Sequence, residues 1–66
     1  MVENDVMLTA KQVRGRYGGV SDMAIWRWLR DQRLAFPQPI LINSRRYWRL
    51  SDLAQWEVAQ AGRRVA

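Results

Sequence analysis

The stretch of sequence that decides the fold runs from Ser21 to Gln32 and reads SDMAIWRWLRDQ. Ser21 is an N-cap candidate, because a serine side chain can accept a hydrogen bond from a free backbone N–H of the first helical turn. At about 100° per residue, Ile25, Trp28 and Leu29 fall on one side of the helix that follows. We therefore expect an amphipathic helix over residues 21–32, with this side in the core.

The opposite side of the same helix has a different chemistry. Met23, Trp26, Arg27 and Arg30 gather there, with no acidic residue at the centre of the face. A helix with one core face and one basic, aromatic face is suited to entering a groove of a nucleic acid. The alternative is a solvated face with no binding role.

A second helix is expected immediately upstream. Thr9 and Gln12 have the spacing of a capping box, in which each side chain bonds the backbone N–H of the other residue. Val13 belongs to an apolar face at helical spacing, and Gly18 and Gly19 end the helix because glycine tolerates a left-handed conformation. The two helices and their short turn form a helix-turn-helix pattern, which any helical hairpin also satisfies.

The sequence downstream predicts a two-stranded β-hairpin. Pro37 and Pro39 exclude a helix, and runs of β-branched and aromatic residues then flank the polar pair Asn43–Ser44. Arg45 and Arg46 follow directly, so we expect the hairpin tip to carry two adjacent arginines. One interpretation is a wing that contacts phosphates or a minor groove, and the other is a solvated turn.

A third helix begins near the N-cap candidate Ser51 and ends at Gly62. The fold class is therefore α+β, mainly α: a small winged helix-turn-helix with two helices, a two-stranded hairpin wing and a C-terminal helix. We expect a flexible leader over residues 1–7, the winged helix-turn-helix DNA-binding domain over residues 8–61 and a basic tail over residues 62–66. The candidate core residues are Leu8, Val13, Tyr17, Val20, Ile25, Trp28, Leu29, Phe36, Ile40, Ile42, Trp48, Leu53 and Trp56.

The charge balance favours an anionic partner. The 66 residues include eleven Lys and Arg against six Asp and Glu, a formal net charge of +5. Lys11 is the single lysine, and arginine carries a planar set of donors that suits phosphates and guanine edges. The functional interpretation is a nucleic-acid partner; the alternative is a basic surface that only keeps the protein soluble.

Composition also argues against several other classes. The chain has no Cys and no His, which excludes disulfides and thiolate zinc sites and removes the commonest general base. We expect no enzyme, no catalytic residue, no metal and no cofactor. The longest apolar run, Ile40–Ile42, is too short to cross a membrane, so we expect a cytoplasmic, nucleoid-associated protein without a membrane partner.

The order of short sequence blocks resembles AlpA-type phage regulators and excisionases, whose fold is similar to the MerR-like winged helix. The blocks that carry this resemblance are Leu8–Val13, Gly19–Ser21, Trp26–Leu29, Phe36–Ile40, Arg45–Arg46, Trp48–Leu53 and Trp56. The resemblance implies a sequence-specific DNA-binding protein of prophage or mobile-element type, acting as a transcriptional regulator or as an excisionase. It also implies that the second helix enters the major groove while the wing meets the adjacent minor groove or backbone.

The resemblance departs from the family pattern at two places. The family often has a basic or small polar residue after the serine, where this chain has Asp22 and Met23, and it usually has glycine in the wing turn, where this chain has Asn43–Ser44. Because Asp22 would repel a phosphate, we expect it to cap its helix or to meet a cytosine amine. These differences concern the DNA sequence that is recognised.

We expect seven residues to contact DNA, with Arg27 or Arg30 reading a guanine or anchoring a phosphate and Met23 touching a thymine methyl. The full set is Ser21, Met23, Trp26, Arg27, Arg30, Arg45 and Arg46. The expected partners are double-stranded DNA and either an integrase or further copies of the protein on tandem sites. The alternative function is a small protein–protein adaptor that uses Met23 and Trp26 without touching DNA. RNA binding is disfavoured because most aromatic residues have core spacing.

Overall fold

A small antiparallel sheet with its longest strand in the middle organises the fold. The computed structural model describes residues 6–63, and in this part of the chain the strands are β1 (Met7–Thr9), β2 (Ile40–Ile42) and β3 (Arg45–Arg49), in the order β1-β3-β2. Leu8 pairs with Trp48 in the first ladder, and Leu41 pairs with Arg46 in the second. With the helices α1 (Ala10–Arg16), α2 (Asp22–Arg30) and α3 (Leu50–Gly62), the α+β class is confirmed.

The sheet has one strand more than the sequence predicted. Residues 7–9 were expected to end a leader and begin a helix, but they pair with β3 instead. The backbone N–H of Leu50 also donates to the carbonyl of Val6 at 2.8 Å, which ties this segment to the start of α3. A strand of three residues is too short to show an alternating pattern, so local sequence could not identify it.

The first two helices begin where the sequence predicted. Thr9 and Gln12 form the expected capping box, with N–H to side-chain distances of 2.9 and 3.2 Å. The Ser21 hydroxyl accepts from the N–H of Ala24 at 3.0 Å at the start of α2. Between the helices, Gly18 and Gly19 both have positive φ. Residues other than glycine rarely adopt positive φ values, which explains why the turn consists of two glycines.

Two helix boundaries differ from the prediction. Helix α2 ends at Arg30, and the Asp31 carboxylate accepts from the N–H of Arg33 at 3.0 Å in the turn that follows. The N-cap of α3 is Arg49 and not Ser51, because β3 ends at Arg49 and α3 begins at Leu50 with no loop between them.

Within residues 6–63, the buried core consists of five residues from five parts of the chain: Val13, Ile25, Phe36, Trp48 and Leu53. Eight partly buried residues pack against them, namely Leu8, Ala10, Tyr17, Val20, Trp28, Leu29, Leu34 and Trp56. The indole N–H groups of Trp48 and Trp56 each donate to a backbone carbonyl at 2.9 Å, those of Pro37 and Leu34 respectively. Buried indoles therefore contribute apolar area without leaving a polar atom unsatisfied.

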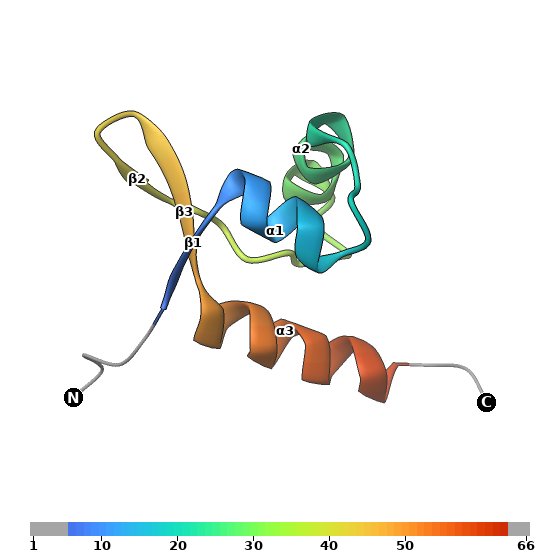
Figure 1. Ribbon diagram of the computed structural model, residues 1–66. Helices are drawn as coiled ribbons and strands as arrows, with labels where there is room; N and C mark the ends of the chain where they lie inside the picture. Colours follow the sequence, from blue (N-terminus) through green and yellow to red (C-terminus); the bar gives the residue numbers. More distant parts are fainter. Residues whose placement is uncertain (1–5, 64–66) are drawn as a thin grey trace.

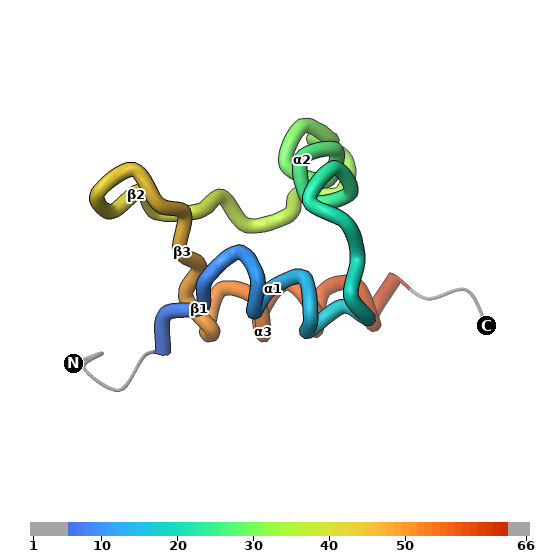
Figure 2. Tube along the Cα trace, turned by 45° about the horizontal axis from the view of Figure 1, so that its top comes forward, coloured from blue at the N-terminus to red at the C-terminus, as the bar shows by residue number. Residues whose placement is uncertain are grey.

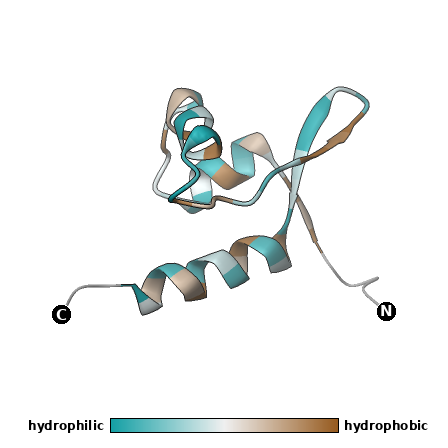
Figure 3. Cartoon of the chain, turned by 180° about the vertical axis from the view of Figure 1, so that it is seen from behind, coloured by the Kyte–Doolittle hydropathy of each residue, from teal (hydrophilic) through white to brown (hydrophobic). Residues whose placement is uncertain are grey.

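The core prediction was wrong for Ile40 and Ile42, which are 36% and 49% exposed, and it missed Leu34 and Ala10. Strand β2 is an edge strand in a hairpin that extends away from the helices (Figure 1). Coloured by hydropathy, β2 is visibly hydrophobic although it lies on this projecting arm (Figure 3). An apolar β-branched run indicates a strand, but it does not indicate which layer covers that strand.

The hairpin and α2 stand on the same side of the molecule. Figures 1 and 2 show both of them projecting away from α3, with α1 between α3 and α2. Of the expected leader and tail, residues 1–5 and 64–66 lie outside the described residues, while Met7 belongs to β1 and Gly62 is the last residue of α3. Within residues 6–63, no helix has both the length and the apolar character needed to cross a membrane.

Candidate nucleic-acid interface

The two faces of α2 are divided as the sequence predicted. Ile25 is buried, whereas Met23 and Trp26 on the opposite face are 56% and 50% exposed, and Arg27 and Arg30 are exposed beside them. The guanidinium carbon of Arg30 lies 4.7 Å from the centre of the Trp26 ring. This cation–π contact holds one arginine of the face against an aromatic surface, so that its donors are already oriented before any ligand arrives.

The backbone conformation of the hairpin turn explains why Asn43 stands there. Asn43 and Ser44 both have positive φ, 51° and 67°. Two successive residues in this region are typical of the tight turns that match the twist of a hairpin, and Asn tolerates them better than most residues. The family that the sequence resembles usually has glycine in this turn, and in this chain the Asn–Ser pair adopts the positive φ values that glycine would allow.

The two arginines after the turn do not act as a pair. Neighbouring residues of a strand point to opposite faces, so Arg45 and Arg46 diverge. Arg45 is exposed, but Arg46 turns towards α2, where its Nη2 atom lies 3.1 Å from Oδ1 of Asp22. Its guanidinium carbon also lies 5.7 Å from the centre of the Trp48 ring. The expectation of two adjacent arginines at the hairpin tip is therefore wrong for Arg46.

Asp22 thus has a partner that its local sequence did not reveal. Its carboxylate is 66% exposed and pairs with the 31% exposed Arg46, linking the first turn of α2 to β3. At about 100° per residue, Asp22 flanks the Trp26 edge of the exposed face, and Arg27 lies at the other edge. The hairpin therefore adjoins the Met23 and Trp26 side of this face. A pocket of about 230 Å³ lies here, lined by Asp22, Met23 and Trp26.

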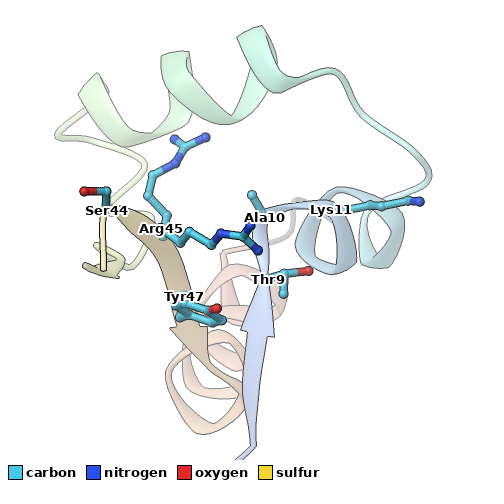
Figure 4. Close-up of a pocket in the computed structure, with 7 residues that line it drawn as sticks. Thr9, Ala10, Lys11, Ser44, Arg45 and Tyr47 are labelled. Atoms are coloured by element: carbon cyan, nitrogen blue, oxygen red, sulfur yellow. The ribbon is translucent and has the colours of Figure 1, made fainter. Parts of the chain in front are cut away.

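A second hollow, which we call the notch, lies between the hairpin and the beginning of α1. It has a volume of about 340 Å³ and is lined by Thr9, Ala10, Lys11, Ser44, Arg45, Arg46 and Tyr47 (Figure 4). In Figure 4, the Arg45 side chain extends from the hairpin towards Thr9 and Ala10. Sequence reasoning did not include Lys11 in the site, because no local signal brings it close to Arg45.

Arg16 takes part in a cluster of hydrogen bonds between α1 and α3. The Glu57 carboxylate accepts two hydrogen bonds from Arg16, at 2.6 and 2.8 Å, and one from the Tyr17 hydroxyl at 2.6 Å. The hydrogen bonds from Arg16, and secondarily that from Tyr17, lower the pKa of Glu57 below its ordinary 4.5. Burial, and then the hydrogen bond to Glu57, raises the pKa of Tyr17 above its ordinary 10.0. This cluster joins α1 to α3 and leaves Arg16 committed to a structural role.

Among the described residues, no group of three or more carboxylates is placed to hold a metal ion. No protein-family model, curated protein or solved structure matches this chain. The functional interpretation therefore depends on the arrangement of its residues. Of the seven expected contact residues, the Asp22–Arg46 pair brings Arg46 next to the α2 residues, while Arg45 belongs to the notch.

Proposed function

We propose that this protein binds double-stranded DNA sequence-specifically as a small winged helix-turn-helix protein. In this proposal α1 and α2 form the helix-turn-helix, and the β2–β3 hairpin is the wing. The observation that carries the proposal is the ion pair of 3.1 Å between Asp22 and Arg46, which joins the hairpin to α2 beside an exposed face of arginine and apolar side chains. The resemblance to AlpA-type regulators and excisionases supports the same assignment.

Helix α2 is the element that would enter the major groove. An α-helix with its side chains is about 10–12 Å across and the major groove is about 12 Å wide, so α2, whose nine residues span about 14 Å along its axis, can lie in the groove. Arg27 and Arg30 supply donors for a guanine edge or a phosphate, and Met23 and Trp26 supply apolar surface for thymine methyl groups. The Ser21 hydroxyl caps α2 through its oxygen and keeps its O–H as a donor for a phosphate oxygen.

The formal charge of +5 supports binding that depends on phosphates. A protein that neutralises DNA phosphates releases cations bound to the duplex, so its affinity falls as the salt concentration rises. The logarithm of the affinity falls by about one per logarithmic unit of salt for each phosphate neutralised. A single module of this kind covers about 600–1,000 Å² of protein surface, which is small for tight binding. Further copies on tandem sites, or an integrase, would supply the remaining affinity, in the cytoplasm of a cell whose nucleoid carries the mobile element.

Selection of duplexes from a random pool, followed by fluorescence anisotropy at several salt concentrations, tests the proposal. We expect a short enriched sequence and an affinity that falls steeply with salt. Retention of no duplex, or an affinity independent of salt, would contradict it.

The alternative function, a protein–protein adaptor, has one observation in its favour. The pocket beside Met23 and Trp26 combines an exposed thioether with an exposed indole, and tryptophan is among the residues that dominate protein-binding hot spots. An adaptor would bind its partner through Trp26 and show no salt-dependent binding to a duplex. The anisotropy experiment therefore separates the two functions.

A further inference from the structure

We propose that the notch between α1 and the hairpin is a second DNA contact, a site for the sugar–phosphate backbone in which Arg45 and Lys11 bind phosphate oxygens. This inference rests on the proposed function and adds α1 to the surface that touches the duplex. It assigns a role to Lys11, which neither the helix-turn-helix pattern nor the hairpin sequence suggested.

The charge of the notch is the first support. Its lining includes Lys11, Arg45 and Arg46 and contains no carboxylate. Arg46 is neutralised by Asp22, but within residues 6–63 neither Lys11 nor Arg45 has an ion-pair partner. Two cations without acidic partners beside one hollow give it a positive potential, which attracts an anion.

The polar groups around these cations are the second support. Ser44 and Tyr47 line the same hollow and bring hydroxyl groups to it, which are donors that commonly contact phosphate oxygens in protein–DNA complexes. Thr9 also lines it, but its oxygen is already the acceptor of the capping box of α1. In Figure 4, the Arg45 side chain extends from the hairpin towards Thr9 and Ala10, while the Lys11 side chain extends along α1, away from the hairpin.

The position of the notch favours a polymer over a free anion. The hairpin contacts α2 through Arg46, and Arg46 and Arg45 both line the notch. A backbone that passes α2 can therefore continue along the hairpin to Arg45 and then to Lys11. The cations sit on exposed side chains of different elements, which suits a strand already held at α2 better than it suits an isolated small ion.

The experiment compares three variants that each lose one positive charge: Lys11→Gln, Arg45→Gln and the matched control Arg33→Gln. Arg33 is exposed and lines a different hollow near the end of α3, together with Gln60 and Arg63. Binding of a short duplex of mixed sequence is measured by anisotropy between about 50 and 200 mM salt. Circular dichroism establishes that the variants remain folded, as expected for exposed side chains.

We expect Lys11→Gln and Arg45→Gln each to weaken binding several-fold and to reduce the salt slope by about one, whereas Arg33→Gln leaves the slope unchanged. If Lys11→Gln and Arg45→Gln have the same salt slope as Arg33→Gln while the unchanged protein binds DNA, the assignment of the notch as a backbone site is overturned. The proposed function would then still stand. Failure of the unchanged protein to bind any duplex would overturn both.

Inorganic phosphate distinguishes a free-anion site from a backbone site. It is added to the complex at constant ionic strength, with chloride as the reference. We expect phosphate and chloride to displace the duplex equally. Stronger displacement by phosphate from the unchanged protein, lost in Lys11→Gln and Arg45→Gln, would show that the notch takes a free anion and would overturn the backbone assignment.

Discussion

The Nη2 atom of Arg46 lies 3.1 Å from the Oδ1 atom of Asp22, so a strand of the hairpin is bonded to the first turn of α2. Both residues were expected to have separate roles, Arg46 at the hairpin tip and Asp22 as a helix cap or a partner of a cytosine amine. Their pairing places a carboxylate at the edge of the proposed DNA-binding face and occupies one of the arginines that would otherwise meet a phosphate. On our proposal, Asp22 therefore restrains binding as well as positioning the hairpin.

Asp22→Asn tests this restraint. The change removes a negative charge from the edge of the face and frees Arg46, so we expect tighter binding to DNA of arbitrary sequence and a salt slope steeper by up to about one. Discrimination between the selected duplex and a random one should fall. The exposed ion pair contributes less than about 1 kcal/mol, so thermal unfolding should change little. Unchanged binding to both duplexes would show that Asp22 has no such effect.

Arg27→Ala tests base reading by α2. If Arg27 contacts a guanine, its loss should cost about 1–3 kcal/mol on the selected duplex and relax the preference at one position of the sequence. Repeating the selection with the variant measures this preference directly. The matched control is Arg33→Ala, which removes the same charge away from α2 and should leave the selected sequence unchanged. Identical selected sequences for Arg27→Ala and the unchanged protein would remove Arg27 from the site.

The Glu57 cluster predicts how stability depends on pH. The pKa of Glu57 is lower in the folded state than its ordinary 4.5, so its contribution to stability is present above about pH 4.5 and is lost as the pH falls through the folded value. The pKa of Tyr17 is raised above 10.0, so stability falls as the pH rises beyond about 10. Urea unfolding across the pH range measures the loss of stability at low pH and at high pH. The variant Glu57→Gln should lose less stability at low pH than the unchanged protein does.

Tyr17→Phe isolates the hydroxyl of the same cluster. The substitution keeps the ring that packs edge-to-face on Trp28 and removes the hydrogen bond of 2.6 Å to Glu57. We expect a loss of about 1.5–3 kcal/mol in the free energy of unfolding, because hydrogen bonds to charged groups are worth about this much. Tyr47→Phe, at a ring outside this cluster, serves as the control and should be close to neutral. Equal effects of the two substitutions would contradict the assignment.

Leu53→Ala should be the more damaging of two truncations on α3. Leu53 is fully buried against the core. Removing its side chain should cost about 2–5 kcal/mol, a large share of the stability of so small a domain. Val58 lies on the same helix and is largely exposed, so Val58→Ala should leave the free energy of unfolding almost unchanged. Chemical denaturation of both variants checks the contrast. A costly Val58→Ala would show that this surface is covered, for instance by a second copy.

Features decided by neighbouring residues could be predicted from the sequence. The capping box of Thr9 and Gln12, the Ser21 cap and the separation of Ile25 from the Met23 and Trp26 face all depend on spacing within one or two helical turns. Spacing of this kind acts through the local backbone alone. The order of helices, hairpin and final helix followed from the same signals.

Features that depend on distant pairings could not be predicted. Strand β1 exists because Leu8 meets Trp48, and nothing within residues 7–9 indicates this partner. The exposure of Ile42 depends on how far the hairpin extends beyond the helices, and the notch depends on the start of α1 lying beside the hairpin. Each of these features depends on how two elements pack together. The residue pattern within one segment does not indicate which other segment packs against it.

The direct passage from β3 to α3 has a mechanical consequence. Because the strand ends at Arg49 and the helix begins at Leu50, no loop residues separate the hairpin from the final helix. Helix α3 is the longest helix among the described residues, so a change in the direction of β3 would reorient a large part of the molecule with it. On our proposal of DNA binding, a duplex that moved the hairpin would therefore also reposition α3.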